Sequence, residues 1–412
     1  MKDRTELLQK FAALVVRVGA NVQPGQVAII NSDIQSAPMT RLIVEECWKA
    51  GASDVLVRYT DEPCTRLRYE YGTVDRLSQV KPWQLEQLLD YSQREVCLIS
   101  VDSNDPDLLA GIAADKVGSV MNAVQAGMKP FYDLLDKGEN QWTIVAVPSP
   151  AWAAKVFPEL PVDQAVDKLW DAIALTTRLD TPDPVAAWQQ HRTALAAYSK
   201  FMNESGIRTL HFQNSLGTDL TLDLAEGNRW AGGGDQRDDG VPYHPNMPTE
   251  EVFSMPHRAG VNGKVVASLP LCYRGSFIEN FSFTFQDGMV VDYTAEKGRD
   301  TLTQMLAADE GAKHLGEVAL VPYSSPIRRS GILFYSTLFD ENAACHLALG
   351  SAYPDTMQDC LCMTEEQRAA KGFNDSPNHV DFMFGTADLS VLGTTADGRT
   401  LPVFQNGEWA IR

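Results

Sequence analysis

The sequence predicts an α/β protein made of an N-terminal doubly wound domain on a mostly parallel sheet and a strand-rich α+β C-terminal domain. Three observations predict this. The chain has 412 residues, which suits two domains at about 100–200 residues each. Apolar strand patterns alternate with helical patterns as far as residue 205. Short alternating runs separated by turn residues take over from residue 207 onward.

The N-terminal part shows the helix–strand alternation of a parallel sheet. A helical pattern is followed by a Pro24-Gly25 turn and a buried strand, and a second amphipathic helix ends at Gly51. The predicted strands are 26–30, 54–59, 95–101 and 142–147, and helices are expected over 5–18, 37–50, from about 113, over 162–176 and over 184–205. The first strand runs into Asn31-Ser32-Asp33 and lacks the G-x-G-x-x-G fingerprint, so we expect a scaffold, substrate wall or dimer surface here and no dinucleotide site.

The C-terminal part has the sequence pattern of an antiparallel sheet. Turn signals such as Asn262-Gly263 and Asp287-Gly288 separate short alternating runs. The predicted strands are 210–213, 219–224, 265–269, 282–285 and 289–293, with one helix over 299–309. We therefore expect a scaffold and substrate-wall domain over residues 1–206 and a metal-binding catalytic domain over residues 207–412.

Charge and composition exclude several classes of function. The formal net charge of −19 disfavours nucleic acid and anionic membranes as partners, because phosphate groups bind basic surfaces. No apolar run reaches 18 residues, and the chain starts without the apolar segment of a signal peptide, so we expect no membrane span and a cytoplasmic location. The seven cysteines include no C-x-x-C pair, so neither a structural zinc site nor a thioredoxin-like motif is predicted.

Four short stretches of the C-terminal part place acids and imidazoles among apolar residues. They lie at 246–253, 315–321, 338–350 and 376–383. The last contains His-x-Asp, and alternation along a strand directs both side chains to one face. Their acids and histidines are Glu250, Glu251, Glu317, Asp340, Glu341, His346, His379 and Asp381.

Among these residues Glu317 most needs a binding partner, because it is a carboxylate within a sequence that otherwise predicts a buried strand. Burying an isolated carboxylate is costly, so Glu317 must be paired, protonated or bound to a metal. Arg328 and Arg329 lie nearby in sequence and leave a structural ion pair open as an alternative. The case for a metal site rests on the four motifs together.

Carboxylates combined with imidazoles suit zinc, cobalt or manganese. A single catalytic zinc takes three protein ligands, and this set is larger. It fits a pair of ions that share a carboxylate, an arrangement that activates water and clamps a substrate. Hydrolysis is therefore the expected reaction class.

The same stretches resemble the aminopeptidase T and aminopeptidase S family of metallo-aminopeptidases, most closely over 246–253, 315–326, 331–353 and 374–383. The resemblance implies an enzyme that removes N-terminal amino acids from peptides, binds two divalent ions per chain and forms a homodimer. The family motif commonly has Gly-Glu where this chain has Glu250-Glu251, so the ligand is assigned to Glu251, with Glu250 as the alternative. The implied metal ligands are Glu251, Glu317, Glu341, His346, His379 and Asp381, and Tyr353 stands at the position of a catalytic tyrosine.

Chemistry suggests a role for each of the central residues. We expect Glu251 to bridge the ions, Glu317 or Glu341 to take the proton from the attacking water, and Tyr353 to donate a hydrogen bond to the oxyanion. The ions are zinc, cobalt, manganese or magnesium, among which the sequence does not choose. A two-metal hydrolase of another amide or of a phosphoester, or a non-catalytic metal-stabilised binding protein, are the alternatives.

Overall fold

The computed structural model describes residues 4–92, 96–103, 105–135, 137–273 and 276–411. The chain divides into two compact units. Unit 1 comprises the chain up to His191 together with Gly234–Pro248, and unit 2 comprises Arg192–Gly233 and Thr249–Arg412. The expected boundary after residue 206 coincides with the end of a long helix, whereas the observed division falls inside that helix.

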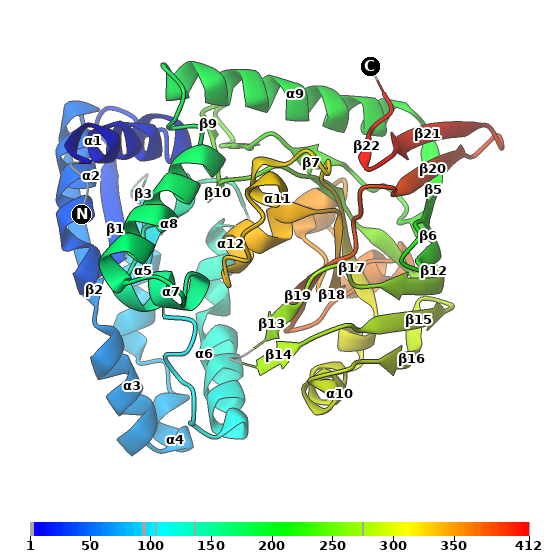
Figure 1. Ribbon diagram of the computed structural model, residues 1–412, viewed down its shortest axis with the longest axis horizontal. Helices are drawn as coiled ribbons and strands as arrows, with labels where there is room; N and C mark the ends of the chain where they lie inside the picture. The colour runs from blue at the N-terminus through cyan, green and yellow to red at the C-terminus, as the bar shows by residue number, and fades with distance from the viewer. Residues whose placement is uncertain (1–3, 93–95, 104, 136, 274–275, 412) are drawn as a thin grey trace. The chain divides into compact units, whose positions relative to one another are not determined.

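Unit 1 is built on a five-stranded sheet in the order β10-β4-β3-β1-β2, and every neighbouring pair in it is parallel (Figure 1). Its strands are β1 (Val27–Asp33), β2 (Asp54–Thr60), β3 (Val96–Asp102), β4 (Trp142–Ala146) and β10 (Asn246–Met247). The first four match the four predicted strands, although residue 95 of the predicted third strand lies outside the described residues. The parallel sheet is thus the one expected from the alternation of strands and helices.

Helices cover the sheet of unit 1. Ile29 on β1 packs with Leu88 and Phe131, while Ala28 and Ile30, which point to the opposite face, are also fully buried. Burial on both faces explains why these strands read as continuous apolar runs. The helices are α1 (Thr5–Leu14), which continues as a π-helix over Val15–Gly19, α2 (Ala37–Lys49), α3 (Glu62–Tyr71), α4 (Val74–Leu77), α5 (Pro82–Ser92), α6 (Ala114–Leu135), α7 (Pro150–Val156), α8 (Val162–Thr176) and α9 (Pro184–Glu204).

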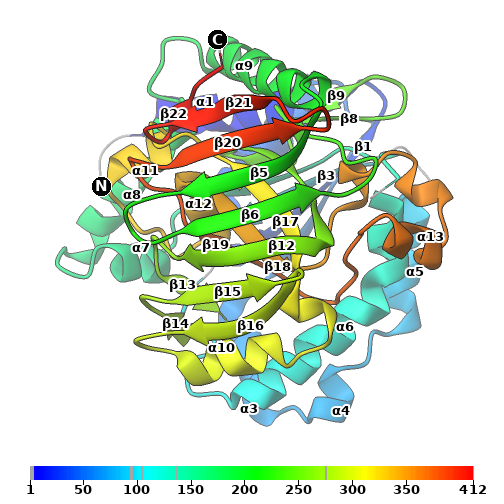
Figure 2. The ribbon, with the colours of Figure 1, turned by 90° about the vertical axis from the view of Figure 1, so that its right-hand side faces the viewer.

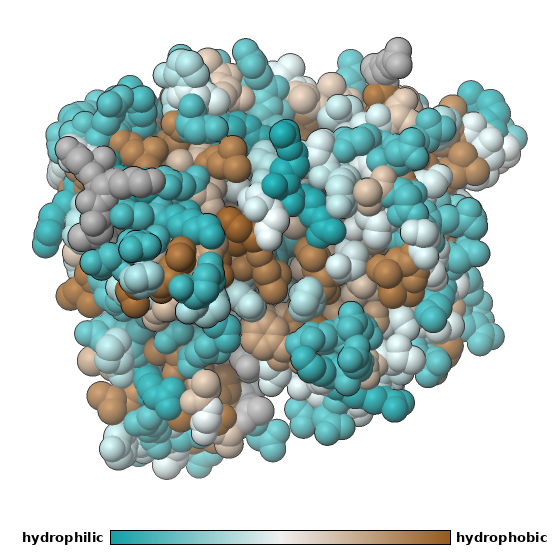
Figure 3. Space-filling model, viewed as in Figure 1, coloured by the Kyte–Doolittle hydropathy of each residue, from teal (hydrophilic) through white to brown (hydrophobic). Residues whose placement is uncertain are grey.

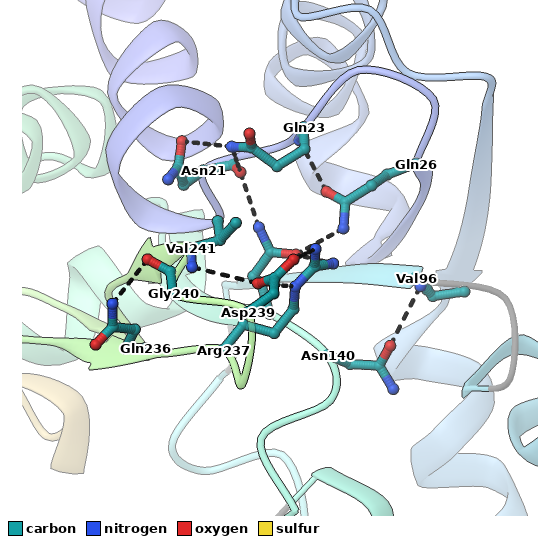
Figure 4. Close-up of polar contacts among 11 residues, drawn as sticks. Asn21, Gln23, Gln26, Val96, Asn140, Gln236, Arg237, Asp239, Gly240 and Val241 are labelled. Atoms are coloured by element: carbon teal, nitrogen blue, oxygen red, sulfur yellow. Dashed lines mark hydrogen bonds and ion pairs between the residues drawn. The ribbon is translucent and has the colours of Figure 1, made fainter.

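The segment Gly234–Pro248 belongs to unit 1 although the chain before and after it belongs to unit 2. It contributes β8 (Asp235–Gln236), β9 (Pro242–Tyr243) and β10. The Asn21 amide donates to the Pro242 carbonyl at 2.7 Å, and within the segment Arg237 pairs with Asp239, as Figure 4 shows. Arg237 also donates to Gln141 at 3.4 Å. This segment leads directly into Glu250 and Glu251.

The two larger sheets of unit 2 are antiparallel. An eight-stranded sheet has the order β16-β15-β12-β6-β5-β20-β21-β22 (Figure 2), and a five-stranded sheet has the order β19-β18-β17-β11-β7. Apolar side chains of both sheets share one core, in which the Phe283 and Phe382 rings lie 5.0 Å apart, centroid to centroid. The larger sheet consists of β5 (Ile207–Gln213), β6 (Asp219–Leu224), β12 (Pro256–Val266), β15 (Ser282–Gln286), β16 (Met289–Thr294), β20 (Ser390–Thr395), β21 (Thr400–Gln405) and β22 (Glu408–Trp409).

The smaller sheet of unit 2 carries the residues of interest. Its strands are β7 (Ala231–Gly232), β11 (Val252–Ser254), β17 (Leu315–Leu320), β18 (His346–Gly350) and β19 (His379–Met383). Between the strands lie β13 (Leu271–Tyr273), β14 (Ser276–Ile278), α10 (Arg299–Leu306), α11 (Pro326–Ser330), α12 (Thr337–Asp340) and α13 (Glu365–Ala370), with short 3₁₀ turns at Ile34–Ser36, Gly311–Lys313, Glu341–Ala343, Pro354–Thr356 and Cys360–Cys362. The strand-rich character expected of this part is therefore observed.

One turn expected in unit 2 is a strand interior. Asn262 and Gly263 do not close a hairpin but lie within β12, and the strand expected over 265–269 shares only its first two residues with β12. Gly263 has φ +114°, and a Cβ atom there would stand 2.3 Å from the Asp219 carbonyl oxygen on β6. The glycine is needed for close approach of two strands, which sequence alone does not distinguish from a turn.

The surface mixes polar and apolar side chains. Figure 3 shows hydrophilic residues over much of the viewed face, with hydrophobic residues scattered between them. Exposed aromatic residues include Tyr71 and Trp83 of unit 1. Among the helices within the described residues, none has the length and apolar character needed to cross a membrane.

Candidate metal centre

One face of the smaller sheet of unit 2 gathers the predicted ligands. On the central strand β18, His346, Ala348 and Gly350 alternate along this face. Glu317 of β17 stands opposite Ala348 on one side, and Asp381 of β19 stands opposite the same Ala348 on the other. The short Ala348 side chain therefore leaves room above the sheet between two carboxylates.

A β-bulge aims Glu317 at this face. The pairing of β17 with β18 shifts between Leu315 and Glu317, so that Gly316 is the extra residue. In a regular strand Leu315 and Glu317 would point the same way. Instead Leu315 joins the apolar core and Glu317 turns to the other side, which is the effect that a bulge has on side-chain direction. A Cβ at Gly316 would lie 2.2 Å from the Ser351 carbonyl oxygen, so only glycine fits here.

Four short contacts connect the predicted ligands in a chain. His346 Nε2 lies 3.2 Å from Glu251 Oε2 and 3.7 Å from Glu317 Oε1. His379 Nε2 lies 3.0 Å from Glu317 Oε2 and 3.2 Å from Asp381 Oδ1. Glu317 thus presents one carboxylate oxygen to each histidine.

These contacts define two groups with the geometry of a metal site. Glu251, Glu317 and His346 form one trio, and Glu317, His379 and Asp381 form the other; within each trio the ligand atoms lie within 4.8 Å of one another. Glu317 is the member that the two trios share. Carboxylate oxygens with one imidazole in each trio are a donor set that divalent ions accept.

Each histidine is oriented by a backbone carbonyl. His379 Nδ1 lies 2.7 Å from the Ser351 carbonyl oxygen, and His346 Nδ1 lies 3.2 Å from that of Ala344. Since a carbonyl only accepts, Nδ1 carries the proton and Nε2 faces the carboxylates. This is the usual arrangement of a metal-binding histidine.

The buried carboxylates of the cluster favour positive charge beside them. Burial by itself would lower the pKa of His346 and of His379, yet the adjoining carboxylates raise the pKa of both well above the usual value. Burial raises the pKa of Glu251, and the negative charges of Glu317 and Asp381 add to that effect. For Glu317, burial raises the pKa, but the hydrogen bonds from the two histidines and the charge of His379 together leave it below the usual value. Divalent ions would supply the positive charge that these buried carboxylates favour.

Glu341 lies beside the cluster but belongs to neither trio within the described residues. It opens the 3₁₀ turn that follows α12. Burial, followed by the negative charges of Glu251 and Asp381, raises the pKa of Glu341 well above the usual value. A carboxyl beside the cluster and outside both trios is placed where it can exchange a proton with a molecule bound there.

Tyr353 stands at the edge of the cluster. Its ring centroid lies 4.5 Å from that of His379 and 6.1 Å from that of Phe253. Burial and the surrounding carboxylates, with Glu317 first among them, raise the pKa of Tyr353 well above 10, so the hydroxyl keeps its proton. The residue as a whole is 44% exposed, but its hydroxyl is buried, so a protonated donor stands beside the cluster.

The structure also separates the alternatives considered for neighbouring residues. The backbone N–H of Glu250 donates to Asn342 Oδ1 at 2.7 Å, and Glu251, not Glu250, belongs to a trio. The contacts of Glu317 with two histidines replace the ion pair considered with Arg328, whose guanidinium lies over the Tyr323 ring at 5.0 Å.

Asp340 has a structural role in this neighbourhood. Its carboxylate accepts the N–H groups of Phe334 at 2.8 Å and Ser336 at 3.1 Å, and its burial raises its pKa to about 7. Asp340 therefore caps a turn.

Sequence reasoning missed the small residues that make room for the site. Gly350 has φ +112°, and a Cβ there would stand 2.0 Å from the Asn378 carbonyl oxygen. Gly232, in a Gly-Gly-Gly run that reads as a flexible loop, forms β7, and a Cβ there would lie 2.7 Å from the Glu251 carbonyl oxygen. A glycine directly after an apolar strand was the available signal for Gly350, but its meaning depends on the neighbouring strand.

Comparison with known proteins confirms the resemblance, the fold and the assignment as an enzyme. Residues 4–409 match the family model described as thermophilic metalloprotease (M29). "Aminopeptidase 2" of Geobacillus stearothermophilus is 40% identical over 98% of this chain and 97% of its own length, and "Aminopeptidase T" of Thermus aquaticus is 40% identical over 99% of each. The solved structure of wild-type AmpT from Thermus thermophilus superposes with a TM-score of 0.93 at 38% identity, covering 99% of this chain and 100% of that one. The chain therefore belongs to the M29 family of thermophilic metalloproteases.

Proposed function

We propose that this metalloprotease is an aminopeptidase that removes the first residue of peptides with two divalent ions held by Glu251, Glu317, His346, His379 and Asp381. The observation that carries the proposal is that Glu317 is common to both trios. Its relatives named aminopeptidases cover nearly the whole chain, which supports the choice of substrate.

We assign the bridging role to Glu317, and not to Glu251 as expected from the sequence. The support is that the two oxygens of Glu317 face different histidines, whereas Glu251 Oε2 faces His346. A carboxylate between two sites holds both ions with one side chain. Glu251 and His346 then complete one site, and His379 and Asp381 complete the other.

Glu341 and Tyr353 have separate roles, proton transfer for Glu341 and stabilisation of the oxyanion for Tyr353. When bound, the ions supply Lewis acidity that activates water and polarises the peptide carbonyl. Glu341 accepts the proton of the attacking water and returns it to the leaving amine, because it lies beside the cluster and outside both trios. Tyr353 donates its hydroxyl proton in a hydrogen bond to the oxyanion of the tetrahedral state.

The test is hydrolysis of a panel of aminoacyl-p-nitroanilides. The purified protein is stripped with a chelator and reloaded in turn with cobalt, zinc, manganese and magnesium, which also ranks the ions. Cleavage that chelation abolishes and a metal restores supports the proposal, and an N-acetylated substrate should resist cleavage. A folded, metal-loaded protein that cleaves none of the panel contradicts it, and cleavage of a phosphoester panel in its place would assign another hydrolase.

We also propose a homodimer and a cytoplasmic location. The homodimer follows from the family resemblance, and light scattering during gel filtration tests it. All seven cysteines are free thiols, which suits a reducing compartment. Fractionation of the source cells tests the location.

A further inference from the structure

Asn342 is a fully buried amide that connects two parts of the candidate site. Its Oδ1 atom accepts the backbone N–H of Glu250 at 2.7 Å. Its Nδ2 atom donates to Glu341 Oε1 at 3.3 Å and to the Leu338 carbonyl at 3.4 Å. One side chain thus contacts both the backbone that precedes Glu251 and the carboxylate of Glu341.

The backbone of Asn342 is fixed as well. Its carbonyl accepts the hydroxyl of Ser325 at 2.7 Å, and Ser325 caps the N-terminus of α11 through the N–H of Ile327. The amide therefore has little freedom to move away from Glu341. A donor fixed on one oxygen of a carboxylate limits its rotation, so the other oxygen keeps a defined direction.

We propose that Asn342 is a positioning residue that holds Glu341 at a set distance and direction from Glu251. This inference rests on the proposed function, in which Glu341 transfers the proton. Asparagine is required because the position needs an acceptor on one side and a donor on the other. Aspartate has nearly the same shape and still accepts from Glu250, but it faces Glu341 with an oxygen in place of a donor.

The test is a double-mutant cycle on the metal-loaded enzyme with Asn342→Asp and Glu341→Gln. We expect Asn342→Asp to lower kcat by about 10- to 100-fold, because a displacement near 1 Å costs on the order of 10²-fold. KM should stay within about threefold and both ions should remain, since Asn342 touches neither trio's ligand atoms. In the Glu341→Gln background the further loss should shrink to less than about threefold, because the residue through which Asn342 acts is already disabled.

Three results would overturn the inference. They are an unchanged kcat, a loss of bound metal, or the same fold-loss in both backgrounds, which would mean that Asn342 acts independently of Glu341. Asn342→Ser, which is too short to reach Glu341, repeats the cycle if the aspartate variant does not fold. An inactive wild-type protein would contradict the proposed function, so that failure is told apart from failure of this inference.

Discussion

Replacing Glu341 by glutamine separates a proton acceptor from a metal ligand. Glutamine keeps the length and shape of the side chain and removes its ability to take a proton. Glu341 belongs to neither trio of the described residues, although the family resemblance implied that it is a ligand. The variant leaves Glu251, Glu317 and His346 unchanged.

The two roles predict different magnitudes. Loss of a general base costs about 10²- to 10⁴-fold in kcat, which is about 2.7–5.4 kcal/mol of transition-state stabilisation at 1.36 kcal/mol per tenfold. Both trios stay complete, so the variant should bind as many ions as the wild-type protein, with similar affinity. Glu317→Gln is the matched control: it alters the shared carboxylate and should lose both activity and metal.

The assay combines steady-state hydrolysis of leucyl-p-nitroanilide with metal content by mass spectrometry on the same preparations. A Glu341→Gln protein that lacks one equivalent of metal would show that Glu341 is a ligand. A Glu341→Gln variant with unchanged kcat would show that Glu341 is neither the proton acceptor nor a metal ligand. Both outcomes refute the role inferred from its position outside the trios.

Three more substitutions test other parts of the structure. Tyr353→Phe should lower kcat by about 10²- to 10³-fold with a small change in KM, because it removes a protonated oxyanion donor, and steady-state kinetics checks this. Gly350→Ala should destabilise the fold by at least about 1–3 kcal/mol in urea unfolding, since φ is +112° and the new Cβ would meet the Asn378 carbonyl oxygen at 2.0 Å; an unchanged midpoint would contradict this. Glu62→Gln tests a charge in unit 1: burial, and then the neighbouring Asp33, raise the pKa of Glu62 above 4.5, so the folded state favours its neutral form. The stability that Glu62 contributes in its neutral form is therefore lost as pH rises through the folded pKa. Urea unfolding should show that the free energy of unfolding of the variant, relative to that of the wild-type protein, is higher at about pH 8 than at about pH 5.

The parallel sheet of unit 1 was predictable because both of its faces are buried. Ile29 and Ile30 are equally buried although they point to opposite faces, so the strand is a continuous apolar run in the sequence. Helix α3 was not predicted, because the residue of this helix that is buried is the charged Glu62. A helix without an apolar stripe gives no periodic signal.

Which carboxylate lies at the centre of the site depends on strand order, and no motif contains that order. Neighbouring strands are about 4.8 Å apart, so β19 stands nearly 10 Å from β17, with β18 between them. Glu317 reaches His379 across that gap because the residue opposite it on β18 is Ala348 and because the bulge at Gly316 turns Glu317 toward it. Glu251 precedes β11, which pairs with β17 on the side away from β18. From there Glu251 contacts His346 at the start of β18, whereas Glu317 on β17 contacts both His346 and His379. The expectation that Glu251 bridges the ions followed from residue type alone, and the bulge and the small residue on β18 are what favour Glu317.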